Sequence, residues 1–160
     1  MTSQLPPAQL PPALSEIVEE FQALEERDRL QLLLEFSRGL PELPARLQDH
    51  PELLEQVVEC QSPLFLTIEA EGRGEDARIA LFFRAPAEAP TTRGFAGVLH
   101  EGLNGLPAAT ILAVPDDMPE LLGLTRAVSP LRMRGMTAML GRIKRKVAAY
   151  VAQSTAVAPS

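Results

Sequence analysis

Residues 64–85, LFLTIEAEGRGEDARIALFFRA, contain the pattern that decides the fold of this chain. Two runs rich in apolar, branched and aromatic residues, 64–70 and 77–85, lie on either side of the polar segment 71–76. Runs of this length are typical of β-strands, and a short glycine-containing segment between them is typical of a turn. The stretch therefore predicts a β-hairpin. Its Gly-Arg-Gly lacks the full glycine spacing of a phosphate loop and no predicted helix follows it, so we assign it no ligand.

The longest helix is predicted at the carboxyl end of the chain. Ser129 can supply an N-cap oxygen, and Pro130 fits the first helical turn. Apolar residues then recur every three or four positions, at Met133, Met136, Leu140, Ile143, Val147 and Tyr150. Four basic residues near the predicted end complement the negative end of the helix dipole and otherwise suit a solvated face; they are Arg142, Lys144, Arg145 and Lys146.

A middle helix is predicted between the hairpin and this last helix. Thr91 or Thr92 can cap it, Asn104-Gly105 can end it, and a short segment at 107–113 packs beside it. Its core face consists of Phe95, Val98 and Leu99.

Two further helices are predicted before the hairpin. Apolar residues at helical spacing place the first after Pro12, and Asp28 with Gln31 resembles a capping box for a second helix that stops at Gly39. Prolines keep the next stretch irregular, although residues 53–58 could form a helical turn or an edge strand.

Length and composition indicate one compact domain. The chain has 160 residues, 46% of them hydrophobic, which is enough for one sizeable core. We expect a flexible lead-in at residues 1–12, a single domain at 13–152 and a disordered tail at 153–160. No apolar run approaches the roughly 20 residues of a membrane span, and the first residues do not resemble a secretory signal. A cytoplasmic protein is therefore expected.

Charge is unevenly distributed along the chain. The formal net charge is -6, acids predominate in the first 60 residues, and no acid follows Glu120. The basic end could meet a polyanion, yet the sequence has no tryptophan and few other aromatic residues to stack on bases. Nucleic acid is therefore not an expected partner.

The chain has one cysteine, Cys60. One thiol excludes an internal disulfide and any metal cluster held by several cysteines. Cys60 lies between a proline-broken stretch and the first hairpin strand, followed by the polar pair Gln61 and Ser62. Two interpretations remain open from these residues: a reactive thiol on a loop, or a small packed hydrophobic side chain.

A cysteine hydrolase is a weaker alternative. Cys60, His100 and Asn104 could be written as a catalytic set, but His100 and Asn104 lie at the end of one predicted helix, whereas the third member normally orients the base from another element. His50 and His100 show none of the usual ligand spacings with the single thiol, so no metal site is predicted.

Two separated blocks carry a resemblance to a known family. The first is Cys60-Gln61-Ser62 before an apolar strand, and the second is residues 124–136, which lead into the last helix. Residues 41–43 and 92–97 add support. With these blocks the chain, over roughly residues 13–152, resembles the SufE-type cysteine desulfuration proteins.

The resemblance implies a fold and a set of site residues. It implies an α+β fold shared with IscU-like scaffolds, with a small antiparallel sheet, flanking helices and a long C-terminal helix. It assigns Cys60 as the persulfide acceptor and places Gln61, Ser62 and Arg132 in the same functional region. The family usually has glycine before the cysteine, where this chain has Glu59, whose negative charge should raise the pKa of the thiol.

The resemblance also implies a function. The chain would take persulfide sulfur from a pyridoxal-phosphate-dependent cysteine desulfurase of the SufS type, stimulate that enzyme, and deliver sulfur to an iron-sulfur scaffold of the SufBCD type. It would be a transfer partner with no cofactor of its own, and its segment at residues 59–63 would be mobile. The alternative is a non-catalytic protein-binding adaptor in which Cys60 is only structural. The sequence does not determine the oligomeric state, and a homodimer is one option.

Overall fold

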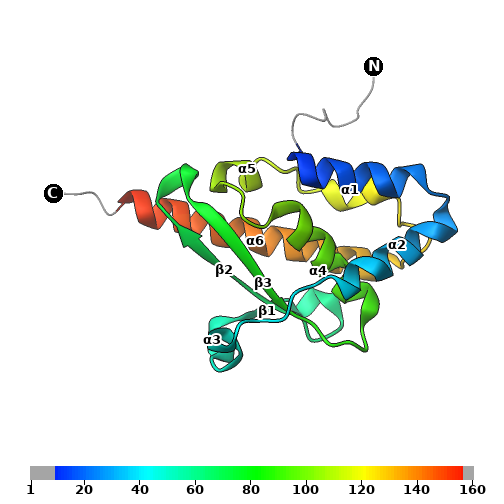
Figure 1. The fold of residues 1–160 in the computed structure, drawn as a ribbon, viewed down its shortest axis with the longest axis horizontal. Helices are drawn as coiled ribbons and strands as arrows, with labels where there is room; N and C mark the ends of the chain where they lie inside the picture. Colours follow the sequence, from blue (N-terminus) through cyan, green and yellow to red (C-terminus); the bar gives the residue numbers. More distant parts are fainter. Residues whose placement is uncertain (1–9, 157–160) are drawn as a thin grey trace, which may run out of the picture.

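The computed structural model describes residues 10–156 and has an α+β architecture (Figure 1). A three-stranded antiparallel sheet in the order β1-β2-β3 is accompanied by helices, of which the C-terminal α6 is the longest (Figure 1). The predicted fold class is confirmed. Residues 1–9 and 157–160, which include most of the expected lead-in and part of the expected tail, lie outside the described residues.

The predicted hairpin is confirmed. Strand β2 spans Phe65–Glu71 and strand β3 spans Arg78–Arg84, paired so that Leu66 faces Phe83 and Ile68 faces Leu81. Because side chains alternate along a strand, these four lie on one face, which packs against the main core. On the other face, Phe65 and Phe82 pack against a second small cluster of Leu43, Leu47 and Leu54. The sheet is therefore covered on both sides, with most of the core on the α6 side.

The stretch before the hairpin forms both of the structures considered for it. A 3₁₀ turn, η2, spans Pro51–Leu53, and a two-residue edge strand, β1, spans Glu55–Gln56 and pairs with β2. A short helix, α3, spans Ala45–Gln48. Strand β1 leads directly toward Cys60.

The first two helices, α1 (Pro12–Ala23) and α2 (Glu26–Arg38), are confirmed, but the predicted capping box is wrong. The N-cap of α2 is Glu25, so Asp28 already lies in the first turn, where its charge suits the helix dipole. Gly39 ends α2 as predicted. At the other end of the expected lead-in, Leu10 and Pro11 are already buried.

The middle helix, α4 (Pro90–Leu103), crosses α2 closely and buries its predicted core face. A Cβ at Gly94 would lie 2.5 Å from the carbonyl oxygen of Leu33, so only glycine lets the two helices approach this closely. The predicted threonine cap is wrong: the helix begins at Pro90 after Ala89, because proline is pre-set for the first turn. A short α5 (Ala108–Leu112) follows.

Helix α6 spans Pro130–Ala156 and runs along the long dimension of the molecule (Figure 1). The predicted cap is confirmed, since the backbone N–H of Arg132 donates to Ser129 Oγ at 3.2 Å. The helix extends past its expected end into the residues expected to be a disordered tail. Its last turns are held to the hairpin turn, where the N–H of Gly74 donates to Ser154 Oγ at 2.8 Å and the Tyr150 hydroxyl donates to the carbonyl oxygen of Gly72.

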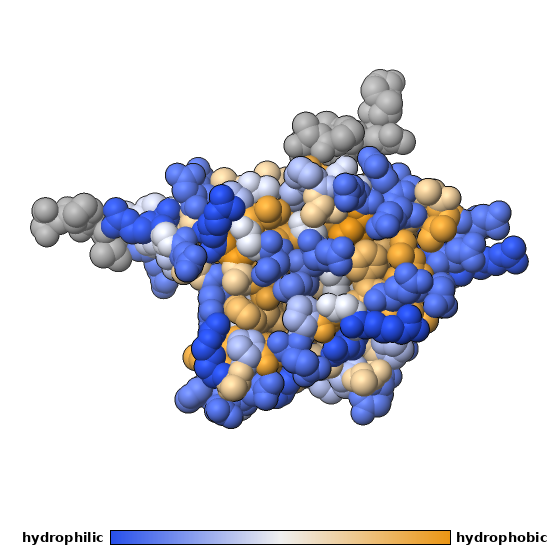
Figure 2. All heavy atoms as spheres, viewed as in Figure 1, coloured by the Kyte–Doolittle hydropathy of each residue, from blue (hydrophilic) through white to orange (hydrophobic). Residues whose placement is uncertain are grey.

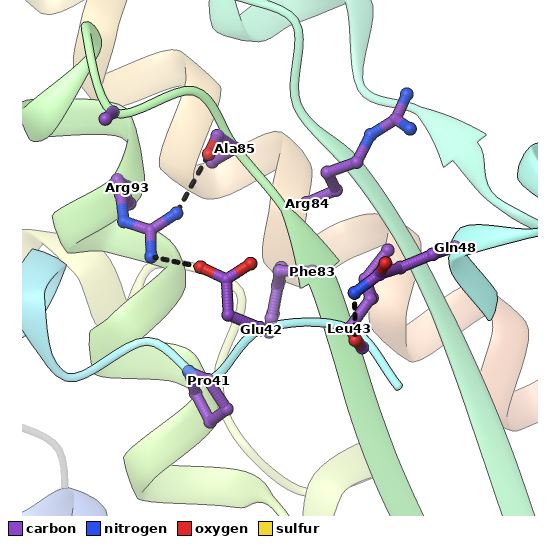
Figure 3. Close-up of a pocket in the computed structure, with 9 residues that line it drawn as sticks. Pro41, Glu42, Leu43, Gln48, Phe83, Arg84, Ala85 and Arg93 are labelled. Atoms are coloured by element: carbon purple, nitrogen blue, oxygen red, sulfur yellow. Dashed lines mark hydrogen bonds and ion pairs between the residues drawn. The ribbon is translucent and has the colours of Figure 1, made fainter. Parts of the chain in front are cut away.

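Arg93, in one of the supporting blocks of the resemblance, ties the start of α4 to its surroundings (Figure 3). Its guanidinium donates to the carbonyl oxygens of Ser37, Leu40 and Ala85 at 3.0, 3.3 and 2.9 Å, and lies 3.9 Å from the Glu42 carboxylate. The two supporting blocks therefore meet in space. Because carbonyl oxygens of the protein itself accept the hydrogen bonds of Arg93, we interpret the pocket in Figure 3 as a structural junction between α2, β3 and α4 and assign it no ligand.

Surface hydropathy varies over the face shown in Figure 2, where hydrophobic areas lie between hydrophilic side chains. Within the described part of the chain, no helix is both long and apolar enough to cross a membrane.

Candidate functional site

Cys60 ends a 3₁₀ turn, η3 (Val58–Cys60), between strands β1 and β2. The segment is closed at its base, because the N–H of Val57 donates to the carbonyl oxygen of Leu64 at 2.9 Å. Cys60 is 3% exposed, and its Sγ lies 3.6 Å from the carbonyl oxygen of Gly135 in α6. The thiol is thus on an irregular segment, as predicted, but it is buried and turned toward α6.

Gly135 makes room for the thiol. A Cβ at this position would lie 3.1 Å from Cα and 3.3 Å from Sγ of Cys60, which is tighter than ordinary van der Waals contact. The missing side chain lets η3 lie directly on α6. Gly135 belongs to the second block of the resemblance, so the two blocks contact each other here.

The thiol of Cys60 is held in its neutral form. Its pKa is raised to about 12, mainly by burial and in addition by the negative charge of Glu59, while the positive charge of Arg142 partly opposes the rise. The expected influence of Glu59 is therefore confirmed, with burial as the larger cause. At neutral pH the closed segment holds a protonated thiol, which is a weak nucleophile.

Gln61 and Ser62 complete the turn. Gln61 has φ of 66°, a left-handed conformation that glycine adopts more readily than other residues, and it is the one non-glycine residue with positive φ among residues 10–156. Its side chain is exposed, whereas Ser62 is half-buried. Neither side chain makes a hydrogen bond within the described residues, so their place at the site is set by the backbone.

The structure brings Arg142, not Arg132, to the Cys60 segment. Arg132 is exposed in the first turn of α6, and its guanidinium makes no ion pair with any described residue. Arg142 contacts Glu55 and Glu59 at 2.8 Å each. The helix continues beyond these basic residues, so assigning them to its C-terminal dipole was wrong. Besides Arg142, two of them form ion pairs: Lys144 with Asp116, and Lys146 with the same Glu55 that Arg142 contacts.

The role of Arg142 was missed in the sequence, although one signal was available. Arg142 follows Gly135 by seven residues, and positions seven apart lie on the same face of a helix. Arg142 therefore lies on the same face of α6 as Gly135, two helical turns later, and this is the face that contacts Cys60. The sequence does not show that the segment with Cys60 packs against that face of α6.

A groove and two exposed hydrophobic residues lie near the segment. A groove of about 510 Å³ lies beside it, lined by Glu59, Glu120, Thr125, Pro130, Met133, Arg134, Thr137 and Ala138. Two large hydrophobic residues that adjoin groove residues in the sequence are exposed, Val58 at 65% and Leu131 at 45%. Exposed apolar residues around a groove are typical of a surface that meets another protein.

The hydrolase set is not assembled. Asn104 Oδ1 accepts a hydrogen bond from the N–H of Leu81 at 2.7 Å, and the His100 ring lies edge-on to Phe83. Burial lowers the pKa of His100, so it is neutral at physiological pH. Among the described residues, neither side chain is hydrogen-bonded to Cys60. The same part of the chain contains no group of three or more metal-ligating side chains.

The fold and the site define a small α+β protein with one sheltered thiol packed against its C-terminal helix. A family model described as SufE, Fe-S metabolism associated domain, matches residues 15–147. The chain belongs to the SufE family, whose members take part in iron-sulfur metabolism.

Known proteins support this assignment. The chain is 53% identical to the uncharacterized SufE-like protein Rv3284 of Mycobacterium tuberculosis, over 88% of this chain and 95% of that protein. It is 29% identical to the chloroplastic/mitochondrial SufE-like protein 1 of Arabidopsis thaliana, over 88% of this chain and 36% of that longer protein. The solution structure of a hypothetical protein from Thermus thermophilus superposes with a TM-score of 0.75 and 37% identity, covering 89% and 98% of the two chains.

Proposed function

We propose that this protein is a sulfur acceptor that carries sulfur as a persulfide on Cys60. Membership of the SufE family supports a role in iron-sulfur metabolism. The observation that carries the finer proposal is the position of the single thiol, on a short irregular segment that packs on α6 next to an apolar groove. Sulfur carriage needs one thiol, and a segment outside the sheet can expose it without unfolding the core.

The transfer is a thiol exchange. The Cys60 thiolate attacks the outer sulfur of a cysteine persulfide on the donor protein and forms a new sulfur-sulfur bond. The sulfur-sulfur bond of the donor breaks, and the donor cysteine leaves as a thiolate. Cys60 ends as a persulfide, and no external oxidant or reductant is needed.

The buried state suits storage, and the exposed state suits attack. In the closed segment Cys60 is almost fully shielded from solvent, and burial together with Glu59 holds the thiol protonated. When the segment opens, solvent reaches the thiol and its pKa falls toward the usual value of about 8.5, so the thiolate becomes available. The function therefore requires segment 59–63 to move when the donor docks.

The donor in this proposal is a pyridoxal-phosphate-dependent cysteine desulfurase of the SufS type, and the acceptor is an iron-sulfur scaffold complex of the SufBCD type. By removing sulfur from the desulfurase, the protein would also stimulate its turnover. The pyridoxal phosphate belongs to the desulfurase, and no metal or organic cofactor is assigned to this chain. Because the free thiol must stay reduced, a cytoplasmic location is part of the proposal.

The burial of Cys60 favours a second candidate. In that case the protein is a non-catalytic adaptor, and Cys60 packs as a small hydrophobic side chain. The adaptor would still use the groove and the exposed Val58, but it would gain no sulfur.

One experiment separates the two candidates. The protein is incubated with a cysteine desulfurase and L-cysteine, and the intact mass is measured for wild type and Cys60→Ser. Wild type should gain the mass of one sulfur atom, which a thiol reductant removes, and the variant should gain none. If wild type gains no sulfur while the desulfurase is turning over, the carrier function is excluded.

A further inference from the structure

Arg142 makes a dense set of contacts with the segment that contains Cys60. Its Nη1 donates to the Glu55 carboxylate at 2.8 Å and to the carbonyl oxygen of Gln56 at 2.6 Å. Its Nη2 donates to the Glu59 carboxylate at 2.8 Å. One guanidinium therefore joins α6 to both β1 and η3, immediately before the thiol.

The arginine is well placed to hold these elements together. Its side chain is 13% exposed, so solvent screens its contacts less than those of a surface ion pair. Lys146, one turn further along α6, contacts the second oxygen of Glu55 at 3.0 Å and keeps that carboxylate in position. Glu59, in contrast, is 46% exposed and can be reached from solvent.

We propose that Arg142 is the positioning residue that holds the segment with Cys60, residues 58–63, closed. This inference rests on the proposed carrier function, which requires that segment to open. The contact between Arg142 and Glu59 is the part that must break for the thiol to emerge. The contacts with Glu55 and Gln56 keep β1 on the sheet while η3 moves.

The position of Glu59 explains why this pair is the releasable one. Glu59 is the residue next to Cys60, so any movement of the thiol away from Gly135 moves its carboxylate as well. Glu55 lies in β1, which is held to β2 by backbone pairing. Of the two acids that Arg142 binds, Glu59 therefore belongs to η3, which moves, and Glu55 belongs to β1, which stays on the sheet.

The test measures access to the thiol without any sulfur chemistry. Native protein at fixed pH is treated with iodoacetamide, and the rate of Cys60 alkylation is followed by intact mass. Arg142→Gln and Glu59→Gln should each speed the reaction on the order of tenfold, and the double variant should show little further increase. Arg145→Gln, which removes the same charge from the exposed side of α6, should react at the wild-type rate.

Arg142→Gln separates this role from a purely electrostatic one. If Arg142 only favoured the thiolate through its charge, then its removal would leave Glu59 uncompensated and slow the alkylation. Alkylation of Arg142→Gln at or below the wild-type rate would overturn the proposal. Far-ultraviolet circular dichroism and urea denaturation check that the variants remain folded. Should Arg142→Gln unfold, Arg142→Lys provides the test, because lysine keeps the charge but cannot hold Glu55 and Glu59 in two separate directions. Faster alkylation of Arg142→Lys supports the proposal, and alkylation at or below the wild-type rate overturns it.

Failure of this inference can be told apart from failure of the carrier function. Faster alkylation of both variants supports the role of Arg142 even if wild type takes no sulfur from a desulfurase. Sulfur uptake by wild type, together with unchanged alkylation of both variants, overturns the role of Arg142 and leaves the carrier function standing.

Discussion

The Sγ of Cys60 lies 3.6 Å from the carbonyl oxygen of Gly135, and the absence of a side chain at Gly135 is what allows this approach. The thiol therefore depends on a glycine 75 residues later in the chain for its shelter. This pairing links stability to access, because any atom added at residue 135 must displace the Cys60 segment or α6.

Gly135→Ala should shift the Cys60 segment toward its open form. The added Cβ would lie 3.1 Å from Cα and 3.3 Å from Sγ of Cys60, so the segment must move away from α6 by a few tenths of an ångström. Alanine stabilises the helix by about 1 kcal/mol relative to glycine, and this gain offsets the cost of moving the segment. The free energy of unfolding should therefore change little. Iodoacetamide labelling should be faster than in wild type.

Gly141→Ala is the matched control for that variant. Its Cβ would approach only Arg145, at 3.9 Å, so it gains helix propensity without touching Cys60. Equal labelling rates for Gly135→Ala and wild type would contradict the assigned role of Gly135.

Alkaline pH should destabilise the wild type through Cys60. Burial raises the pKa of the thiol to about 12 in the folded protein, against about 8.5 in the unfolded chain. Between these values the unfolded chain has lost the proton and the folded protein has kept it. The contribution of Cys60 is therefore complete below about pH 8.5 and is lost as pH rises toward 12, with a loss of about 2 kcal/mol by pH 10.

Urea denaturation of wild type and Cys60→Ser at pH 8 and pH 10 measures this loss, because the other alkaline groups are common to both proteins. The difference between the two free energies of unfolding should shrink or reverse at the higher pH. A difference that stays constant would show that the thiol is not protected as the structure implies.

Gln61→Gly should stabilise the closed turn by up to about 1 kcal/mol. Gln61 has φ of 66°, where a Cβ is strained and glycine is not, although glycine also loses more chain entropy on folding. The same change at Gln31, exposed in α2, should instead cost about 1 kcal/mol, because glycine disfavours a helix. Thermal or urea denaturation gives both values, and two losses of equal size would refute the interpretation of Gln61.

Arg93→Lys should lower the free energy of unfolding by roughly 2 kcal/mol or more. Lysine has one nitrogen and cannot reach the three carbonyl oxygens that the guanidinium joins, so buried acceptors lose their donors. Sulfur uptake by the folded fraction should be unchanged, since this junction lies apart from Cys60. Arg145→Lys should leave stability within about 0.5 kcal/mol of wild type.

Local patterns predicted most of the fold. The hairpin, the core faces of the helices and the Ser129 cap follow from residues close together in the sequence, where alternation, helical spacing and turn chemistry act. The predicted start of α2 was wrong. The helix begins directly after Glu25, and its first turn contains Glu26 and Asp28, whose charges suit the helix dipole without a capping box. The end of α6 was wrong because its last turn is held by the hairpin turn, a contact between residues 80 apart.

The candidate site was only partly predictable for the same reason. Cys60, its two polar neighbours and the effect of Glu59 could be named from adjacent residues and the family pattern. Arg142 could not, because its role depends on α6 lying across the segment between β1 and β2. Arg132 is suggested by the family block; in the structure it is exposed and forms no ion pair with a described residue, and its role at the site stays a prediction.

The hydrogen bond between Val57 and Leu64 limits how far the sulfur can travel. If that bond persists, Cys60 is tethered three residues from a fixed point, and at about 3.5 Å per residue its reach is about 10 Å. This is a short tether rather than a swinging arm. The donor cysteine must therefore be delivered almost to the sheet edge, which favours a partner whose own sulfur sits on a long, projecting loop.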